Sequence, residues 1–546
     1  MNKKTNSNKL LNNNLNKTKQ EILNSIWKET SNLIYESGLE DWEFSSILLR
    51  IIFYRFLSEF FLTKINETDK NLDYENYHKN NNEKNLLQWR QRIVENLGFF
   101  ILPSQLFSNV LKEYKSTTFD ESDLNTKLPS ILEDIQNSSK LNQKAKNAFD
   151  GLFSDFREIL NKLSKDNLSL RNKNLLEILQ KVNDMPLSIS KKDNSVQFAD
   201  AFEYLITMFG SITNKEAKSF FTPYNVSKLL IQLALFNIQD KTDITIYDPT
   251  CGSGSLMLKI LKYIDKENIE MFYGQDKQNQ AFDFCRMNML FHLIPYDKFD
   301  IKCGNTLTND LFKSEGKFDI IVSHPPLNEK WEQIQNDDRF LGPSELPPSE
   351  YSDYAFIEHC LYHLSEEGCF ATICFPGILY RGKKEEKIRK WIFDNNWIDA
   401  VISLGEKMFL GTDIGLIILI LRKNKKDNQI LFINAENEWI KDKVTKQNKG
   451  KNKRNIESKN TLSDANIAKI YDAYIQRKDI DKFSKLVDVD TVINNNYNLS
   501  VNNYVSVKEK EEKPNITLIN EELKEIVNHT NELRVKIDSL IKEIGD

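Results

Sequence analysis

The stretch that decides the fold is "ITIYDPTCGSGSLML", residues 244–258. A short β-branched run leads into a tight loop with Gly252 and Gly254, and an apolar segment of helical character follows. Glycines let a backbone come close to a ligand, and the free N–H groups at the start of the helix would face that ligand. A dinucleotide-binding loop needs a third Gly or Ala at position 257, where this chain has Met257. The stretch therefore disfavours NAD and FAD.

A carboxylate stands at the end of the next predicted strand, "EMFYGQD", which closes on Asp276. In folds of this kind a carboxylate at this place accepts hydrogen bonds from ribose hydroxyls. A nucleoside without a pyrophosphate satisfies both observations, and S-adenosylmethionine is the cofactor that we expect. A purely structural glycine turn is the alternative.

Strand-like and helix-like segments alternate on both sides of the glycine loop. The strand-like runs are "DITIYD", "EMFYGQD", "FDIIVS", "CFATICF" and "IDAVISL", with helix-length segments between them. This alternation predicts an α/β fold of the Rossmann-like kind, in which helices cover both faces of a parallel sheet. Such sheets bind their ligands at the carboxyl ends of the strands.

The chain divides into five predicted parts. Residues 20–195 place apolar residues at helical spacing and carry few strand signals, which indicates an all-helical N-terminal domain. The parts are a disordered arm (1–19), the helical domain (20–195), the α/β domain (196–440), a loop and connecting region (441–514) and a C-terminal helical tail (515–546).

The C-terminal tail repeats apolar residues at alternating four- and three-residue steps, with one interruption. The repeat consists of Ile519, Leu523, Ile526, Thr530, Leu533, Ile537, Leu540 and Ile544. Such a heptad seam predicts a helix that pairs with another helix. Packing on its own domain and docking on another subunit both satisfy the pattern.

Composition excludes several classes of protein. The net charge of -5 gives no global positive field for nucleic acid, so any DNA contact needs a local groove or a basic partner. The six cysteines form no CxxC pair and have no companion histidines at ligand spacing, so we expect reduced thiols and no metal. The N-terminus lacks the apolar block of a signal peptide, and the run "IGLIILIL" at 414–421 is far shorter than the roughly 20 residues of a membrane helix. We expect a soluble, cytoplasmic protein without a membrane partner.

A second informative stretch is "FDIIVSHPPLNEKW", residues 318–331. Proline cannot donate to a sheet ladder, so the strand 318–323 must end before the two prolines. His324 then lies at the carboxyl end of that strand, with its backbone extended by the proline that follows. The position is one where such sheets place their chemistry.

These motifs together resemble one family, the methyltransferase (modification) subunit of type I restriction-modification systems, which methylates adenine N6 in DNA. The resemblance runs in order through "FFTP", "DPTCGSGSL", "YGQD", "CGNTLT", "NDDRF", "SDYAFIEHCLYHL" and "CFPGILYRG". It implies a Rossmann-like S-adenosylmethionine-dependent methyltransferase domain. It also implies double-stranded DNA, a specificity subunit, a second copy of the chain and an endonuclease/translocase subunit as partners.

The resemblance carries over residue by residue. The cofactor-binding residues that it implies are Phe221, Thr222, Pro223, Asp248, Gly252, Ser253, Gly254, Asp276 and Asn305, the last near the adenine of the cofactor. The catalytic residues that it implies are His324, Pro325, Pro326 and Leu327.

Two of these positions depart from the family, which has asparagine at His324 and an aromatic residue at Leu327. The asparagine carbonyl and an adjacent main-chain carbonyl accept the N–H groups of the adenine amine, and the aromatic residue stacks on the flipped base. Neutral histidine can accept one such bond, but its unperturbed pKa lies near neutral pH. Leu327 offers apolar contact without a π face, and base–aromatic stacking is worth roughly 1–3 kcal/mol.

Two hypotheses follow from these departures. In the first, the chain is a working modification subunit that transfers a methyl group from S-adenosylmethionine to adenine N6 in DNA. In the second, it is a weakened or silent methyltransferase fold that serves complex assembly and DNA clamping. A small-molecule methyltransferase is disfavoured, because the helical domain and the heptad seam would have no use there.

Overall fold

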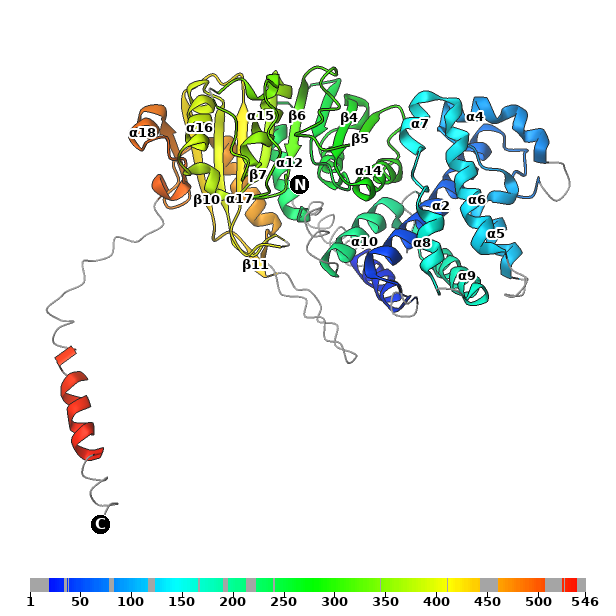
Figure 1. Ribbon diagram of the computed structural model, residues 1–546, viewed down its shortest axis with the longest axis horizontal. Coiled ribbons are helices and arrows are strands. Elements are labelled where there is room, and N and C mark those ends of the chain that lie inside the picture. Colours follow the sequence, from blue (N-terminus) through cyan, green and yellow to red (C-terminus); the bar gives the residue numbers. More distant parts are fainter. Residues whose placement is uncertain are drawn as a thin grey trace, which may run out of the picture.

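The structure is a computed structural model in which an α/β body and a helical body lie side by side (Figure 1). It describes residues 19–33, 37, 39–77, 83–115, 123–164, 167–189, 195–212, 222–238, 241–343, 345–409, 411–441, 460–505, 523–524 and 526–537. The predicted arm, apart from residue 19, lies outside these residues.

The α/β body is built on one nine-stranded sheet with the order β13-β10-β8-β9-β7-β6-β3-β4-β5. Its strands are β3 (Ile244–Asp248), β4 (Ile269–Asp276), β5 (Phe299–Cys303), β6 (Phe318–Ser323), β7 (Leu364–Cys374), β8 (Ile398–Leu404), β9 (Ile417–Arg422), β10 (Gln429–Ala435) and β13 (Ser484–Asp488). Strand β6 ends at Ser323, immediately before His324, as the prolines predict. The chain runs outward from β3 through β4 to β5 and then returns to β6 on the other side of β3.

Helices cover both faces of the sheet, as predicted. Successive strand residues point to opposite faces: Ile320 packs in the cluster beneath the helices of one face and Ile321 in the cluster of the other. On the first face lie α12 (Tyr224–Leu235), α13 (Ser255–Leu258), α14 (Asn279–Phe291) and α17 (Asp464–Gln476). On the second lie α15 (Asp353–His363), α16 (Lys384–Asp394) and α18 (Val489–Asn494).

The sheet is mixed, which corrects the prediction of a parallel sheet. Strand β9 runs antiparallel to both β7 and β8, and β13 runs antiparallel to β10. In the described residues between β8 and β9, 405–409 and 411–416, there is no helix, and a parallel pair would require such a crossover. The apolar run at 414–421 therefore supplies a central strand of the sheet.

The structure also differs from the predicted loop and connecting region over 441–514. Within its described part, 460–505, lie β12 (Asn460–Thr461), α17, β13, α18 and the 3-10 turn η8 (Val501–Asn503). Ile467, Ile470 and Tyr474 of α17 are buried at helical spacing against the sheet. These residues belong to the α/β body.

The helical body comprises residues 19–33 and a set of mostly short helices. They are α2 (Asp41–Thr68), α4 (Arg90–Leu97), α5 (Phe107–Lys115), α6 (Leu124–Ser138), α7 (Gln143–Phe149), α8 (Phe156–Lys162), α9 (Leu168–Asp184) and α10 (Phe198–Ile212), with the 3-10 turns η1 (Glu83–Trp89), η2 (Pro103–Gln105) and η3 (Ser139–Leu141) and the strand pair β1 (Leu187–Ser188) and β2 (Val196–Gln197). The central helix α2 is buried along most of its length.

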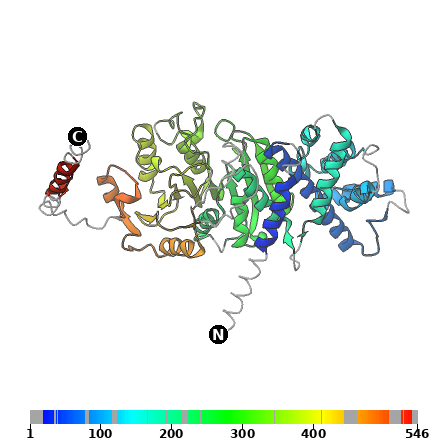
Figure 2. The same ribbon diagram turned by 90° about the horizontal axis from the view of Figure 1, so that it is seen from below.

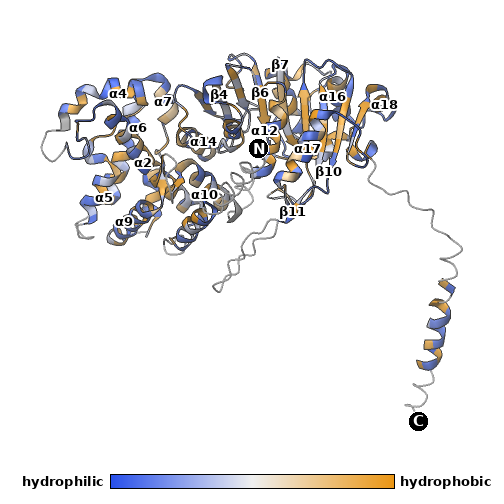
Figure 3. Cartoon of the chain, turned by 180° about the vertical axis from the view of Figure 1, so that it is seen from behind, coloured by the Kyte–Doolittle hydropathy of each residue, from blue (hydrophilic) through white to orange (hydrophobic). Residues whose placement is uncertain are grey.

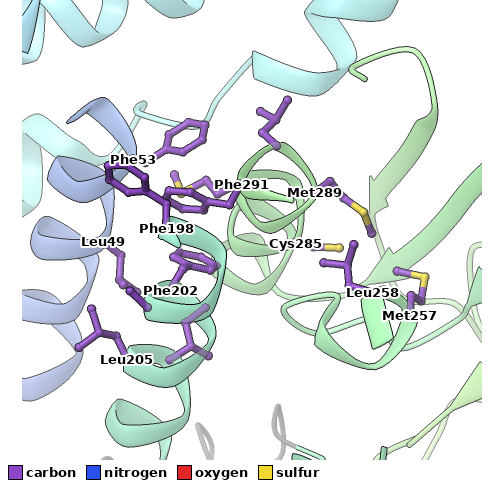
Figure 4. Close-up of a cluster of buried hydrophobic side chains, with 14 of the residues drawn as sticks. Leu49, Phe53, Phe198, Phe202, Leu205, Met257, Leu258, Cys285, Met289 and Phe291 are labelled. Atoms are coloured by element: carbon purple, nitrogen blue, oxygen red, sulfur yellow. The ribbon is translucent and has the colours of Figure 1, made fainter. Parts of the chain in front are cut away.

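Helix α14 joins the two bodies (Figure 4). Phe291 at its end packs among Phe53 of α2 and Phe198 and Phe202 of α10. On the other side of the same helix, Cys285 lies beside the glycine loop.

Ion pairs reinforce this joint. Arg50 of α2 donates to Asp283 of α14 at 3.2 Å, and Asp283 also accepts from Arg286 at 2.6 Å. Arg286 in turn donates to the carbonyl of Asp150 in the helical body at 2.6 Å. Both arginines are buried, so the contact between the two bodies combines an apolar cluster with buried ion pairs.

The described part of the C-terminal tail, residues 523–524 and 526–537, is helical and stands apart from both bodies (Figures 1 and 2). Its seam residues are exposed: Leu523 by 53%, Ile526 by 63%, Leu533 by 46% and Ile537 by 54%. Apolar and polar residues alternate along it in Figure 3. Ile519, Leu540 and Ile544 lie outside the described residues. Over the described ranges, no helix has the length and apolarity to cross a membrane.

Candidate active site

A cavity of about 170 Å³ opens where the chain reverses its direction of progress across the sheet, between β3 and β6. Ligands of open α/β sheets bind at such a switch point, outside the carboxyl ends of the strands. Five residues predicted from the sequence line this cavity: Gly252, Asp276, Asn305, His324 and Pro326. They come from the ends of β3, β4, β5 and β6.

The glycine loop needs its glycines for conformation and space. Gly252 and Gly254 adopt positive φ angles of 53° and 74°. A Cβ at Gly254 would lie 2.8 Å from Cys285 Sγ of α14, closer than atoms approach without displacement. The loop is thus pressed against α14, and Asn288 of that helix donates to the carbonyl of Ser253 at 2.9 Å.

Asp276 ties the end of β4 to this loop. Its Oδ2 accepts the N–H of Gly252 at 3.0 Å, and its Oδ1 accepts the N–H of Gln278 at 2.9 Å. Burial raises the pKa of this carboxyl, while these two N–H groups oppose the rise. Each oxygen keeps a lone pair for a ligand hydroxyl.

Asp248 and Ser253 are buried behind the cavity wall, and neither lines the cavity. Asp248 Oδ1 accepts the N–H of Thr250 at 2.9 Å, which shapes the turn after β3. Burial raises the pKa of Asp248 to about 7. Ser253 lies within 3.1 Å of Ser255 through its hydroxyl. Both residues support the loop from behind.

His324 is fixed at the tip of β6 by neighbours on two sides. Its Nδ1 lies 3.0 Å from Thr222 Oγ1, and the Phe409 ring meets it edge to face at 5.4 Å between ring centres. Burial lowers the pKa of His324 to about 4, so the imidazole is neutral at physiological pH. This removes the charge that an unperturbed histidine gains near neutral pH.

Pro325 and Leu327, which flank Pro326 in the sequence, do not line the cavity. Pro325 is buried, and Leu327 packs against the main apolar core instead of lining the cavity. Leu327 is half-buried, and it contributes no surface to the cavity lining. Pro223 caps the start of α12, whereas Phe221 lies outside the described residues.

Sequence reasoning missed the apolar wall of the cavity. Leu307, Trp331 and Phe356 line it and pack in one small cluster with Phe340 and Ala355. Ser352 also lines the cavity, and its buried hydroxyl has no hydrogen-bond partner within the described structure. The signal was present, because Phe356 belongs to the motif "SDYAFIEHCLYHL", but its position depends on how α15 packs.

Behind this wall lies a buried polar cluster of Asp310, His359 and His363, whose ligand-type atoms lie within 4.8 Å of one another. Arg339 already supplies a positive charge there: its guanidinium is 3.0 Å from His359 Nδ1 and 3.9 Å from Asp310 Oδ2. Arg339 also donates to the carbonyls of Thr306 and Leu307 at 2.7 and 2.8 Å. The cluster fixes the cavity wall, and we assign no metal to it.

Comparison with known proteins gives consistent results. The sequence profile of the family N-6 DNA Methylase matches residues 191–513. The "Type I restriction enzyme MpnII methylase subunit" of Mycoplasma pneumoniae is 36% identical over 537 residues, which cover 95% of each chain. The "MjaIX methylase subunit" of Methanocaldococcus jannaschii is 25% identical over 552 residues, covering 96% of this chain and 92% of the relative.

Solved structures agree with these relatives. A type I restriction-modification methyltransferase subunit from Streptococcus thermophilus superposes with a TM-score of 0.76 at 28% identity, covering 89% of this chain and all, 100%, of that one. A chain from a structure of a type I restriction-modification assembly gives a TM-score of 0.59 at 17% identity, covering 96% and 99%. The second likeness concerns the fold alone.

Proposed function

We propose, from the premise that this chain belongs to the N-6 DNA Methylase family as a methylase subunit of type I restriction-modification systems, that it methylates adenine N6 in DNA with S-adenosylmethionine. The observation that carries the proposal is the cavity at the switch point, which brings the glycine loop, Asp276 and His324 together.

The residues of the cavity suit this cofactor. Asp276 offers carboxylate oxygens to ribose hydroxyls, and Leu307, Trp331 and Phe356 offer an apolar wall to an adenine ring. Asn305, exposed beside that wall, offers its amide to the ring edge. When bound, S-adenosylmethionine supplies a methyl group on a sulfonium, which the amine nitrogen takes as the C–S bond breaks.

His324 and the prolines orient the amine. The prolines keep the strand tip rigid, so that the imidazole and the main-chain carbonyl of Pro325 can each accept one N–H of the amine. Two accepted bonds turn the nitrogen lone pair toward the methyl group. The proton that the amine gives up passes to water, because an imidazole with a pKa near 4 does not retain it.

Partners follow the family. We propose that DNA reaches the site through a specificity subunit that binds two copies of this chain, and that an endonuclease/translocase subunit joins this complex in the cytoplasm. The exposed seam of Leu523, Ile526, Leu533 and Ile537 supports docking of the C-terminal helix on another subunit. An apolar seam in water favours a partner surface.

The test is transfer of labelled methyl from S-adenosylmethionine to host-derived DNA by the complex reconstituted with its specificity subunit. We expect label in N6-methyladenine, and none with Asp276→Ala, which removes the predicted ribose contact. Absence of label with the unaltered complex, under conditions in which it binds both cofactor and DNA, would contradict the proposal.

A second candidate is a non-enzymatic role in complex assembly and DNA clamping, and it is favoured because Leu327 packs partly on the core and does not line the cavity. It predicts a stable complex and DNA binding that survive Asp276→Ala. Deletion of residues 515–546 should dissolve that complex if the C-terminal helix docks on the partner, and an intact complex after the deletion would exclude this docking.

A further inference from the structure

The imidazole of His324 has one nitrogen tied to the protein and one nitrogen available. Nδ1 lies 3.0 Å from Thr222 Oγ1, and the residue lines the cavity. Across the described residues, Nε2 has no hydrogen-bond partner. Thr222 itself does not line the cavity, so its contact with the site runs through His324.

We propose that Thr222 is a positioning residue for the tautomer of His324 that the reaction needs: with the target amine bound, Nδ1–H donates to Thr222 Oγ1, and the lone pair of Nε2 is presented to that amine. This inference rests on the proposed function and deepens it, because it names how a histidine performs the work of an asparagine.

Hydrogen-bond chemistry leaves two arrangements for this pair. A neutral imidazole carries one N–H and one lone pair, whereas the threonine hydroxyl can donate or accept. If Thr222 donated to Nδ1, Nε2 would carry the proton. Its N–H would then face the N–H of the amine, and no hydrogen bond would form between them. If Thr222 accepts from Nδ1, Nε2 accepts from the amine. The bond between Thr222 and Nδ1 forms in both arrangements, so the bound amine, which can only donate here, selects the second. Without Thr222, the Nδ1–H of that arrangement would lose a hydrogen bond worth about 1 kcal/mol, which is roughly fivefold in its population.

The same hydroxyl would serve an asparagine at position 324. The Nδ2–H group of a carboxamide would donate to Thr222 Oγ1 and leave Oδ1 facing the cavity, which is the same acceptor pattern. A histidine fits this position because both side chains present one donor to Thr222 and one acceptor to the amine. The ring of Phe409 limits the alternative ring orientations by its edge-to-face contact.

The first test reads the tautomer without any catalysis. The full chain is labelled with 15N in its 6 histidines, and His324→Asn identifies the resonances of His324. In the complex with the specificity subunit and target DNA, we expect a pyrrole-type Nδ1 and a pyridine-type Nε2, and a shift of the ratio toward Nε2–H in Thr222→Val. A pyrrole-type Nε2 in the unaltered complex would overturn the inference.

The second test separates positioning from cofactor binding. In the reconstituted complex, Thr222→Val should lower kcat about fivefold while the Kd of S-adenosylmethionine changes less than twofold, and Thr222→Ser, which keeps the hydroxyl, should retain kcat. A raised cofactor Kd with unchanged kcat would overturn the inference and make Thr222 a cofactor contact. If the complex transfers no methyl at all, the proposed function fails, while the 15N spectra still decide the tautomer.

Discussion

The two halves of the cavity are built on different principles. In the cofactor half, Asp276 and the glycine loop are joined through main-chain N–H groups, so the shape is fixed by the backbone. In the strand-tip half, the prolines fix the backbone, but the acceptor is a side chain whose orientation depends on Thr222. The comparison teaches that the cofactor half tolerates little exchange, whereas the strand tip can exchange asparagine for histidine if a neighbour orients it.

The largest expected effect is weaker cofactor binding after a substitution in the cofactor half. Asp276→Ala removes the acceptor for two N–H groups and the predicted ribose contact, so we expect the Kd of S-adenosylmethionine to rise about 100-fold, from two charge-assisted bonds of about 1.5 kcal/mol each. Isothermal titration calorimetry measures this Kd. Asp300→Ala is the matched control, because Asp300 lies on neighbouring β5, pairs with Lys302 and does not line the cavity. Equal loss in both variants would show general damage.

The two halves of the cavity contribute to folding stability with opposite dependence on pH. The pKa of His324 is lowered to about 4, so the unfolded chain binds this proton more readily, and stability is lost as the pH falls below 6.5. Between pH 7.5 and 5 the loss amounts to about 2 kcal/mol. The pKa of Asp248 is raised to about 7, so its contribution is present at low pH and is lost as the pH rises through 7.

Thermal unfolding of variants measures both slopes. Relative to the unaltered protein, His324→Asn should gain stability on acidification from pH 7.5 to 5, and Asp248→Asn should lose it over the same range. Slopes of equal sign would contradict the assignment of opposite protonation preferences to the two halves.

The smallest expected effect is a faster reaction after a substitution at the strand tip. His324→Asn should raise kcat about tenfold, because a carboxamide aligns its acceptor better than a ring and an improvement of about 1.4 kcal/mol is one factor of ten. The Kd of S-adenosylmethionine should not change. Leu327→Tyr should give no gain, since Leu327 packs partly on the core and does not line the cavity. A faster Leu327→Tyr enzyme would show that this side chain reaches the base.

Sequence reasoning located the features that are local in the chain. The strand–loop–helix around Gly252, the carboxylate at the end of β4 and the strand that stops before His324 all depend on neighbouring residues, and the structure places each as expected. The antiparallel insertion of β9 and the contribution of β13 depend on pairing between distant segments, which periodicity alone does not encode.

The apolar wall and the tautomer partner were beyond sequence patterns for the same reason. Phe356 faces the cavity because of how α15 packs, and Thr222 meets His324 across 102 residues of chain. Leu327 holds the family's aromatic position in the sequence, yet its half-buried side chain packs partly on the core and does not line the cavity. Such orientations are decided by packing, not by spacing.

Helix α14 has a consequence for motion. One side of it packs with the phenylalanines of α2 and α10, and the other supports the glycine loop through Cys285 and Asn288. Because one helix contacts both, a ligand that restricts the motion of the glycine loop would also restrict the motion of the helical body, at a cost in conformational entropy outside the cavity. A partner that binds the helical body and restricts its motion beforehand would lower this entropic cost. Cofactor and partner would then bind with positive cooperativity and without a change in the average structure.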